Sequence, residues 1–146
     1  MALQLSAGRR AALRCVLALC IAVTVSACDN RDAAEADRVG RALGQLETLP
    51  HLTQADLAEG ELLFHQFCAG CHGARAAGTE QGPPLVHRVY EPGHHGDYAF
   101  VRAITTGVRA HHWSFGDMPP VEGVEPEQII RIIGYIRHLQ REAGID

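Results

Sequence analysis

Five consecutive residues near the middle of the chain constrain its fold more than any other feature. They read Cys68-Ala69-Gly70-Cys71-His72 and form the pattern C-x-x-C-H, which is typical of covalent c-type haem attachment. In such a site each cysteine sulfur forms a thioether with one haem vinyl group, and the histidine ligates the iron. Residues three and four apart share one face of a helix. The pattern therefore predicts a helical segment that presents two sulfurs and one imidazole to a single flat cofactor.

The first 27 residues have the composition of a secretory signal peptide. Three arginines precede an apolar run at residues 15–27, and an acidic segment beginning at Asp29 ends that run, as in a cleaved export signal. The run is shorter than the about 20 apolar residues that a membrane-spanning helix needs. We therefore expect residues 1–27 to be removed during export, with an uncleaved anchor as the alternative.

The end of this segment, Val25-Ser26-Ala27-Cys28, resembles a bacterial lipobox, in which the cysteine is lipidated and becomes the mature N-terminus. Ordinary cleavage after Ala27 is the alternative, because the segment also satisfies a small-residue cleavage site. Lipidation is favoured because Cys28 would otherwise be an exposed thiol without a partner. We therefore expect a lipid at Cys28 to anchor the protein on the periplasmic side of the bacterial cytoplasmic membrane.

The cysteine count supports haem attachment, and the charge of the mature chain indicates the kind of partner it binds. Of five cysteines, two leave with the signal peptide and Cys28 takes the lipid, so only Cys68 and Cys71 remain and no disulfide framework is expected. Removing residues 1–27 takes away three arginines and no acid, which leaves ten basic and seventeen acidic residues and a formal charge of −7. Such an acidic body argues against a nucleic-acid partner and favours a basic docking surface.

The mature chain is expected to divide into a tether and one small domain. Residues 28–52 are rich in Ala, Arg, Asp and Glu, and two glycines weaken any helix there, so we expect a lipid-anchored tether with at most one short helix. The domain then covers residues 53–146. It opens with a helix in which Thr53 and Asp56 stand at the N-cap and N3 positions of a capping box.

Two further helices follow the cysteine motif. One is expected from Asp97, as its N-cap, to Gly107 as its C-terminal stop. The other begins with Pro126 in its first turn, repeats isoleucines on one face, and ends before Gly144. No segment alternates convincingly between polar and apolar residues. The fold class is therefore all-α, with three main helices and long loops wrapped around one covalent haem.

Several landmarks around the cysteine motif have a familiar spacing. They are Gly60-x-x-x-Phe64 before the motif, Gly82-Pro83-Pro84-Leu85 after it, Ile104-x-x-Gly107, Met118-Pro119, and Tyr135 in the isoleucine-rich helix. Together they resemble a class I cytochrome c, over roughly residues 53–143.

The resemblance implies one covalent haem c per chain. Cys68 and Cys71 would provide the thioether links, and His72 and Met118 would be the axial ligands of the iron. The carbonyl of Pro83 would accept a hydrogen bond from His72 Nδ1, which fixes the ring and raises the basicity of the ligand.

Met118 also has an argument of its own. It is the only methionine besides the initiator, and Pro119 directs it away from helical geometry. A thioether is a soft ligand, and His/Met ligation raises the potential of a haem. The alternatives are that Met118 fills a gap in the core, or that His111 or His112 is the distal ligand and gives bis-histidine iron.

With both axial positions filled, we expect an electron carrier or electron-transfer subunit and not an enzyme. Its partners would be redox proteins, namely membrane respiratory complexes or periplasmic oxidoreductases. One alternative is a haem enzyme or a sensor of gas or peroxide with a labile distal ligand. Another is a zinc module in which two histidines, from His94/His95 or His111/His112, join the two cysteines. A redox dithiol is disfavoured because no strand precedes the motif.

Three residues are weaker candidates for contact with the haem propionates, namely Trp113, Tyr90 and Arg109, for which ordinary packing or solvation is at least as good an interpretation. His94 and His95 lie in a glycine-flanked loop. They are expected to be exposed, with accessory metal binding as the lesser alternative.

Overall fold

The computed structural model describes residues 33–34 and 36–146. The chain divides into two units, residues 1–36 and residues 37–146. Of the first unit only residues 33, 34 and 36 are described, and all three are helical. The expected signal peptide at 1–27 and the expected lipidation site Cys28 lie outside the described residues.

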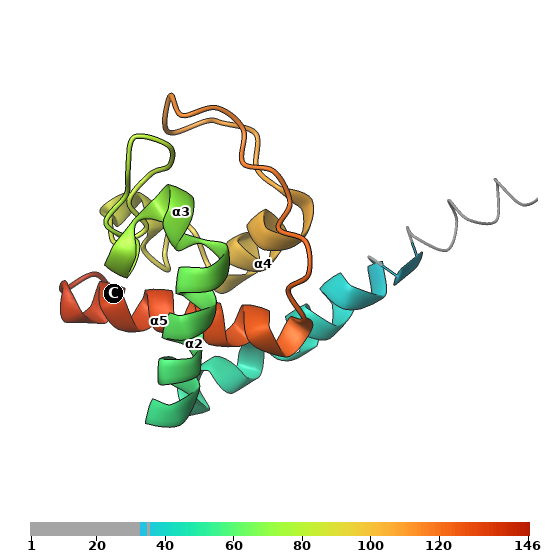
Figure 1. Cartoon of the computed structure of the whole chain (residues 1–146). Helices are drawn as coiled ribbons and strands as arrows, with labels where there is room; N and C mark the ends of the chain where they lie inside the picture. The colour runs from blue at the N-terminus through green and yellow to red at the C-terminus, as the bar shows by residue number, and fades with distance from the viewer. Residues whose placement is uncertain (1–32, 35) are drawn as a thin grey trace, which may run out of the picture. The chain divides into compact units, whose positions relative to one another are not determined.

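The unit of residues 37–146 consists of α-helices and short 3-10 helices joined by loops (Figure 1). A first helical segment at residues 37–44 is followed by η1 (Leu46–His51), α2 (Gln54–Phe67), α3 (Ala69–His72), η2 (Ala74–Ala76), η3 (Arg88–Tyr90), α4 (Asp97–Thr106) and α5 (Pro126–Glu142). Within residues 33–34 and 36–146 there is no β-strand, only an isolated antiparallel bridge between Val108 and Met118. The all-α expectation is confirmed. No helix in the described part of the chain is both long and apolar enough to cross a membrane.

The main helices begin and end close to where local sequence signals place them. The hydroxyl of Thr53 accepts a hydrogen bond from the Asp56 amide, and the Asp56 carboxylate accepts one from the Thr53 amide, which completes the capping box of α2. Pro126 occupies the first turn of α5. Helix α4 begins with Asp97 itself, after Gly96 as N-cap, so the N-cap is one residue earlier than expected.

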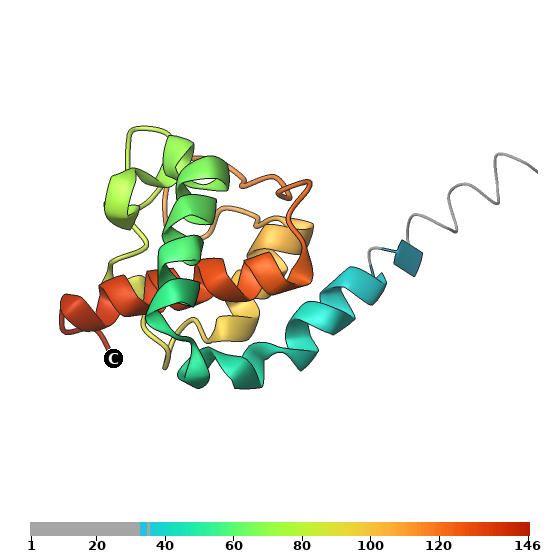
Figure 2. The same cartoon turned by 60° about the horizontal axis from the view of Figure 1, so that its bottom comes forward.

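Helices α2 and α5 cross in close contact (Figures 1 and 2). Gly60 lies at the crossing, where a Cβ atom would overlap the backbone carbonyl of Arg131. One turn further along α2, the fully buried ring of Phe64 packs against Tyr135, with ring centroids 5.6 Å apart. The absence of a side chain at residue 60 thus allows the backbones of the two helices to approach directly.

The segment before α2 belongs to the same compact unit. Ala42 is fully buried, and Leu43, Leu46 and Leu49 pack against the core. The backbone of Gly134 in α5 is covered by the side chain of Leu52. The compact unit therefore begins near Asp37, whereas the sequence suggested a tether that continues to residue 52. Burial of small and branched apolar side chains explains the difference, because it compensates for the weak helix propensity of the segment.

Replacing Gly60 with alanine should destabilise the protein. The new methyl group would force α2 away from the Arg131 carbonyl, and overpacking of this kind costs about 1–3 kcal/mol. Chemical denaturation followed by circular dichroism measures the free energy of unfolding. Gly40→Ala is the matched control, because a Cβ at Gly40 meets nothing within 4 Å. Equal stability of the two variants would contradict the described crossing.

Candidate haem-binding site

The cysteine motif lies where α2 gives way to α3. Cys68 leaves helical geometry, with φ −122° and ψ −34°, and α3 then adds one turn that ends at His72. Cys68 and His72 line an apolar cavity of the domain, whereas Cys71 is exposed and lies outside its lining. The break at Cys68 explains why the three side chains do not share a single continuous helical face, as the spacing alone had suggested.

His72 is held in a defined orientation. The residue is 8% exposed, and its Nδ1 lies 2.9 Å from the carbonyl oxygen of Pro83. Burial lowers the pKa of His72, and the hydrogen bond to Pro83 partly opposes this. The ring is therefore neutral at pH 7, donates its Nδ1 proton to Pro83, and keeps the Nε2 lone pair available. The hydrogen bond expected between these two residues is present.

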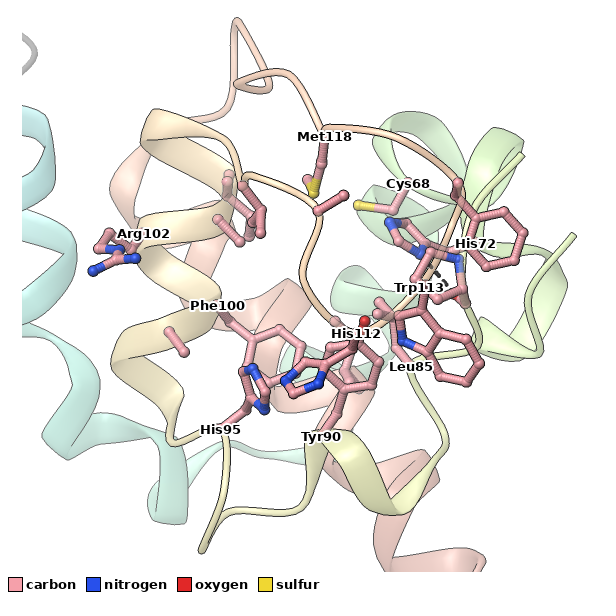
Figure 3. A pocket seen from close by; sticks show the side chains of 18 of the residues that line it. Cys68, His72, Leu85, Tyr90, His95, Phe100, Arg102, His112, Trp113 and Met118 are labelled. Atoms are coloured by element: carbon pink, nitrogen blue, oxygen red, sulfur yellow. Dashed lines mark hydrogen bonds between the residues drawn. The ribbon is translucent and has the colours of Figure 1, made fainter. Parts of the chain in front are cut away.

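Met118 reaches the same cavity from a different part of the chain. Its backbone forms two hydrogen bonds of 2.9 Å with Val108, which close the neck of the loop between them. Gly107 ends α4 with φ +79°, and a Cβ there would lie 2.6 Å from the Met118 carbonyl oxygen, so glycine is required on both counts. Figure 3 shows the Met118 sulfur and the His72 ring directed into one cavity from separate segments.

The walls of the cavity are mainly apolar. The residues that form them are Leu85, Phe100, Ile104, Val108, Ile132 and Ile136. Ile132 and Ile136 belong to the face of α5 on which the sequence repeats isoleucines with a helical period. Apolar walls with a few polar groups are typical of a site for a large organic cofactor.

Polar side chains gather at one side of the cavity, where Figure 3 shows Tyr90, His95, His112 and Trp113 close together. The indole Nε1 of Trp113 is buried and donates no well-formed hydrogen bond within the described residues. Burial raises the pKa of the neighbouring Tyr90, and the Trp113 indole partly offsets that rise. A buried donor whose best acceptor among the described residues is poorly placed fits a ligand that carries carboxylate groups. Arg109, the third candidate for such contacts, is exposed and does not line the cavity.

A buried arginine in α5 holds the chain segment that carries Tyr90 and His95 in place. Arg137 in α5 pairs with Asp97 at 2.7 Å and donates to the carbonyl oxygens of Tyr90 and His95 at 2.6 and 2.5 Å. Gln140 accepts from Arg137 at 2.7 Å and donates to the carbonyl oxygens of Leu85 and Tyr90. Sequence analysis gave these two residues no role. The available signal was a pair of long polar side chains three residues apart within an isoleucine-rich helix.

The thiols and histidines do not form a mixed metal site. Burial raises the pKa of Cys68 to about 12, with Cys71 adding to the rise, whereas reactive dithiols have lowered pKa values. In the described part of the chain, the group of side chains that is close enough to hold a metal ion consists of His94, His95 and His112 and includes no cysteine. Neither the zinc module nor the redox dithiol is supported.

Residues 57–140 match the family model described as Cytochrome c. The chain belongs to the cytochrome c family. No curated protein and no solved structure matches it. Membership implies one covalently bound haem c and supports haem-based electron transfer in general terms. The cavity fits that group, since it combines apolar walls, a neutral histidine, a methionine, a motif cysteine and a buried N–H with no well-formed hydrogen bond within the described residues.

Replacing Arg137 with methionine should strongly destabilise the domain. The change leaves the part-exposed carboxylate of Asp97 without its ion-pair partner and the His95 carbonyl without its side-chain donor, and losing hydrogen bonds to a charged group costs about 1.5–3 kcal/mol. Chemical denaturation measures the change. Arg141→Met, one turn further along α5 and exposed, is the matched control and should lie within about 0.5 kcal/mol of the wild type. Equal stability of the two variants would show that the hydrogen bonds of Arg137 do not stabilise this side of the cavity.

Proposed function

We propose that this protein carries single electrons between redox proteins at the outer face of a bacterial cytoplasmic membrane. In this proposal His72 and Met118 are the axial ligands of the haem iron, and Cys68 and Cys71 form the thioether links. The bound haem supplies the one-electron chemistry. The chain supplies a fixed ligand set, an apolar enclosure and a surface for partners.

The observation that carries the proposal is that His72 and Met118 both line one cavity. The Pro83 carbonyl accepts the Nδ1 proton of His72, which leaves Nε2 as the atom that would bind iron and increases its basicity. Two backbone hydrogen bonds to Val108 hold the main chain of Met118. The side chain that carries the sulfur therefore starts from a fixed position. Two strong ligands leave no open position for a substrate, and rigid surroundings keep the ligation unchanged between oxidation states.

The partners are expected to be proteins with basic docking surfaces. The expected mature chain has a formal charge of −7, from ten basic and seventeen acidic residues, and complementary charge accelerates short-lived encounters. Electron-transfer complexes typically have small interfaces. Membrane respiratory complexes or periplasmic oxidoreductases would suit these properties.

Anchoring through a lipid on Cys28 would keep the domain near the membrane. Because the compact unit begins at Asp37, only residues 29–36 would lie between the anchor and the domain. A chain of that length spans at most about 30 Å when fully extended. The domain would therefore exchange electrons with partners close to the membrane surface.

A haem enzyme or sensor is the second candidate, because His111 and His112 also line the cavity, on the same loop as Met118. However, His112 Nε2 lies 3.3 Å from His94 Nε2, and its ring contacts His95. This arrangement favours Met118 as the distal ligand. Rapid binding of carbon monoxide to the ferrous protein would support the sensor, and an inert ferrous protein would support the carrier.

Replacing Met118 with histidine should lower the reduction potential and remove the sulfur-to-iron charge-transfer band of the ferric protein. An imidazole stabilises ferric iron more than a thioether does, and axial ligands set the potential over a range of roughly 0.8 V. Redox titration and the ferric absorption spectrum measure both effects. His51→Gln, at an exposed position in η1, is the control and should change neither. Retention of the band in the Met118 variant would refute ligation by this residue.

Replacing Cys28 with serine should release the protein from the membrane without altering its haem. The substitution removes the only atom proposed to carry lipid, while the residues of the cavity stay as they are. Fractionation of cells after labelling with a fatty-acid analogue measures the release, and a pyridine haemochrome spectrum checks the haem. A variant that remained in the membrane fraction would show that something other than a lipid on Cys28 holds it there.

A further inference from the structure

Four histidines from two loops gather beside the cavity, and the proposed electron transfer uses none of them. His94 and His95 follow η3, while His111 and His112 lie in the loop between Val108 and Met118. The ring centroids of His94 and His95 are 4.6 Å from each other, and those of His94 and His112 are 5.2 Å apart. Three of the four also line the cavity. The electron-transfer proposal does not explain why imidazoles from two separate segments pack so closely.

We propose that His94, His95 and His112 bind one divalent transition-metal ion of the borderline class, such as Zn²⁺ or Cu²⁺. Neutral imidazole is a preferred ligand for these ions. The three ligand nitrogens lie within 4.8 Å of one another. Water or His111 completes the coordination.

The distance between two of the nitrogens already suits a shared ion. His94 Nε2 and His112 Nε2 are 3.3 Å apart. Two nitrogens bound at about 2.0–2.1 Å to a tetrahedral zinc are about 3.3–3.4 Å apart. The nitrogens of all three histidines lie within 4.8 Å of one another, and binding one ion requires the exposed side chains of His94 and His112 to rotate toward His95.

The third histidine is oriented as a ligand should be. His95 Nδ1 lies 2.6 Å from the carbonyl oxygen of Val89, so its Nδ1 proton is donated to the backbone and Nε2 carries the free lone pair. Histidines that bind metals commonly donate their other nitrogen to a carbonyl in this way. The amides of His94 and His95 both donate to the carbonyl oxygen of Glu91, at 3.0 and 2.8 Å. The backbone of this loop is therefore fixed independently of any ion.

The loop that carries His112 is also fixed on both sides. The Ala110 amide donates to the Asp117 carboxylate at 2.9 Å, within the neck formed by Val108 and Met118. The opposing loop is held by Arg137, which donates to the His95 carbonyl. Two independently held loops thus present imidazoles to one point, an arrangement that lowers the cost of organising a metal site.

Titration of the purified haem protein with Zn²⁺ alone, and separately with Cu²⁺ alone, tests the proposal by calorimetry. We expect one ion per haem. The variant His94→Gln/His112→Gln should bind at least about 10–100-fold more weakly, the loss typical even for residues that only support a ligand. The control His51→Gln/His65→Gln removes two exposed histidines outside the cluster and should bind as the wild type does.

Electron paramagnetic resonance of the Cu²⁺-loaded wild type provides a test that needs no variant. Nitrogen hyperfine splitting from several imidazoles is expected, while the Soret band stays unchanged because the ion does not enter the haem. Absence of uptake, equal affinity in the cluster variant and the control, or a copper signal without nitrogen coupling would each overturn the proposal. The histidines would then serve only as hydrogen-bonding partners of one another or of the haem propionates.

Discussion

At the crossing of α2 and α5 the backbone of Gly60 lies against the carbonyl of Arg131, at a separation that no side chain permits. The position of the cavity follows from this contact. It sets the C-terminal end of α2, and with it Cys68, over the isoleucine face of α5. Because the two helices are far apart in sequence, their direct packing also closes the domain around its cofactor site. The tilted ring pair of Phe64 and Tyr135 extends the same contact.

A second fastening point completes the enclosure from the opposite direction. Arg137 and Gln140 occupy adjacent turns of α5 and satisfy the carbonyl oxygens of Leu85, Tyr90 and His95. The segment between η3 and α4 has little regular structure of its own, so these side-chain bonds replace the backbone ladder that a strand or helix would provide. One helix therefore supplies the floor of the cavity through its isoleucines and anchors one wall through its polar residues.

The features that the sequence revealed depend on neighbouring residues. Each of them is encoded by a few consecutive or nearly consecutive residues. They are the capping box at Thr53, the proline at the start of α5, the stop at Gly107 and the motif from Cys68 to His72. The features that it did not reveal depend on distant partners. To predict them, one must know which segments are neighbours in space. They are the packing of residues 37–52 onto α5, the hydrogen bonds of Arg137 and the contact between the rings of His94 and His112. Local propensity alone contains no such information.

The two backbone hydrogen bonds between Val108 and Met118 also divide this stretch of chain into two parts. One part is the pair itself, which fixes the Met118 backbone, and the other is the loop that it closes. Residues 109–117 form an excursion that leaves this neck and returns to it, and His111, His112 and Trp113 of the excursion line the cavity. A change of length in this excursion would therefore alter the polar side of the cavity, while the backbone of Met118 would keep its pair with Val108. The polar side of the cavity can thus differ in size and composition while the position of the Met118 backbone is preserved.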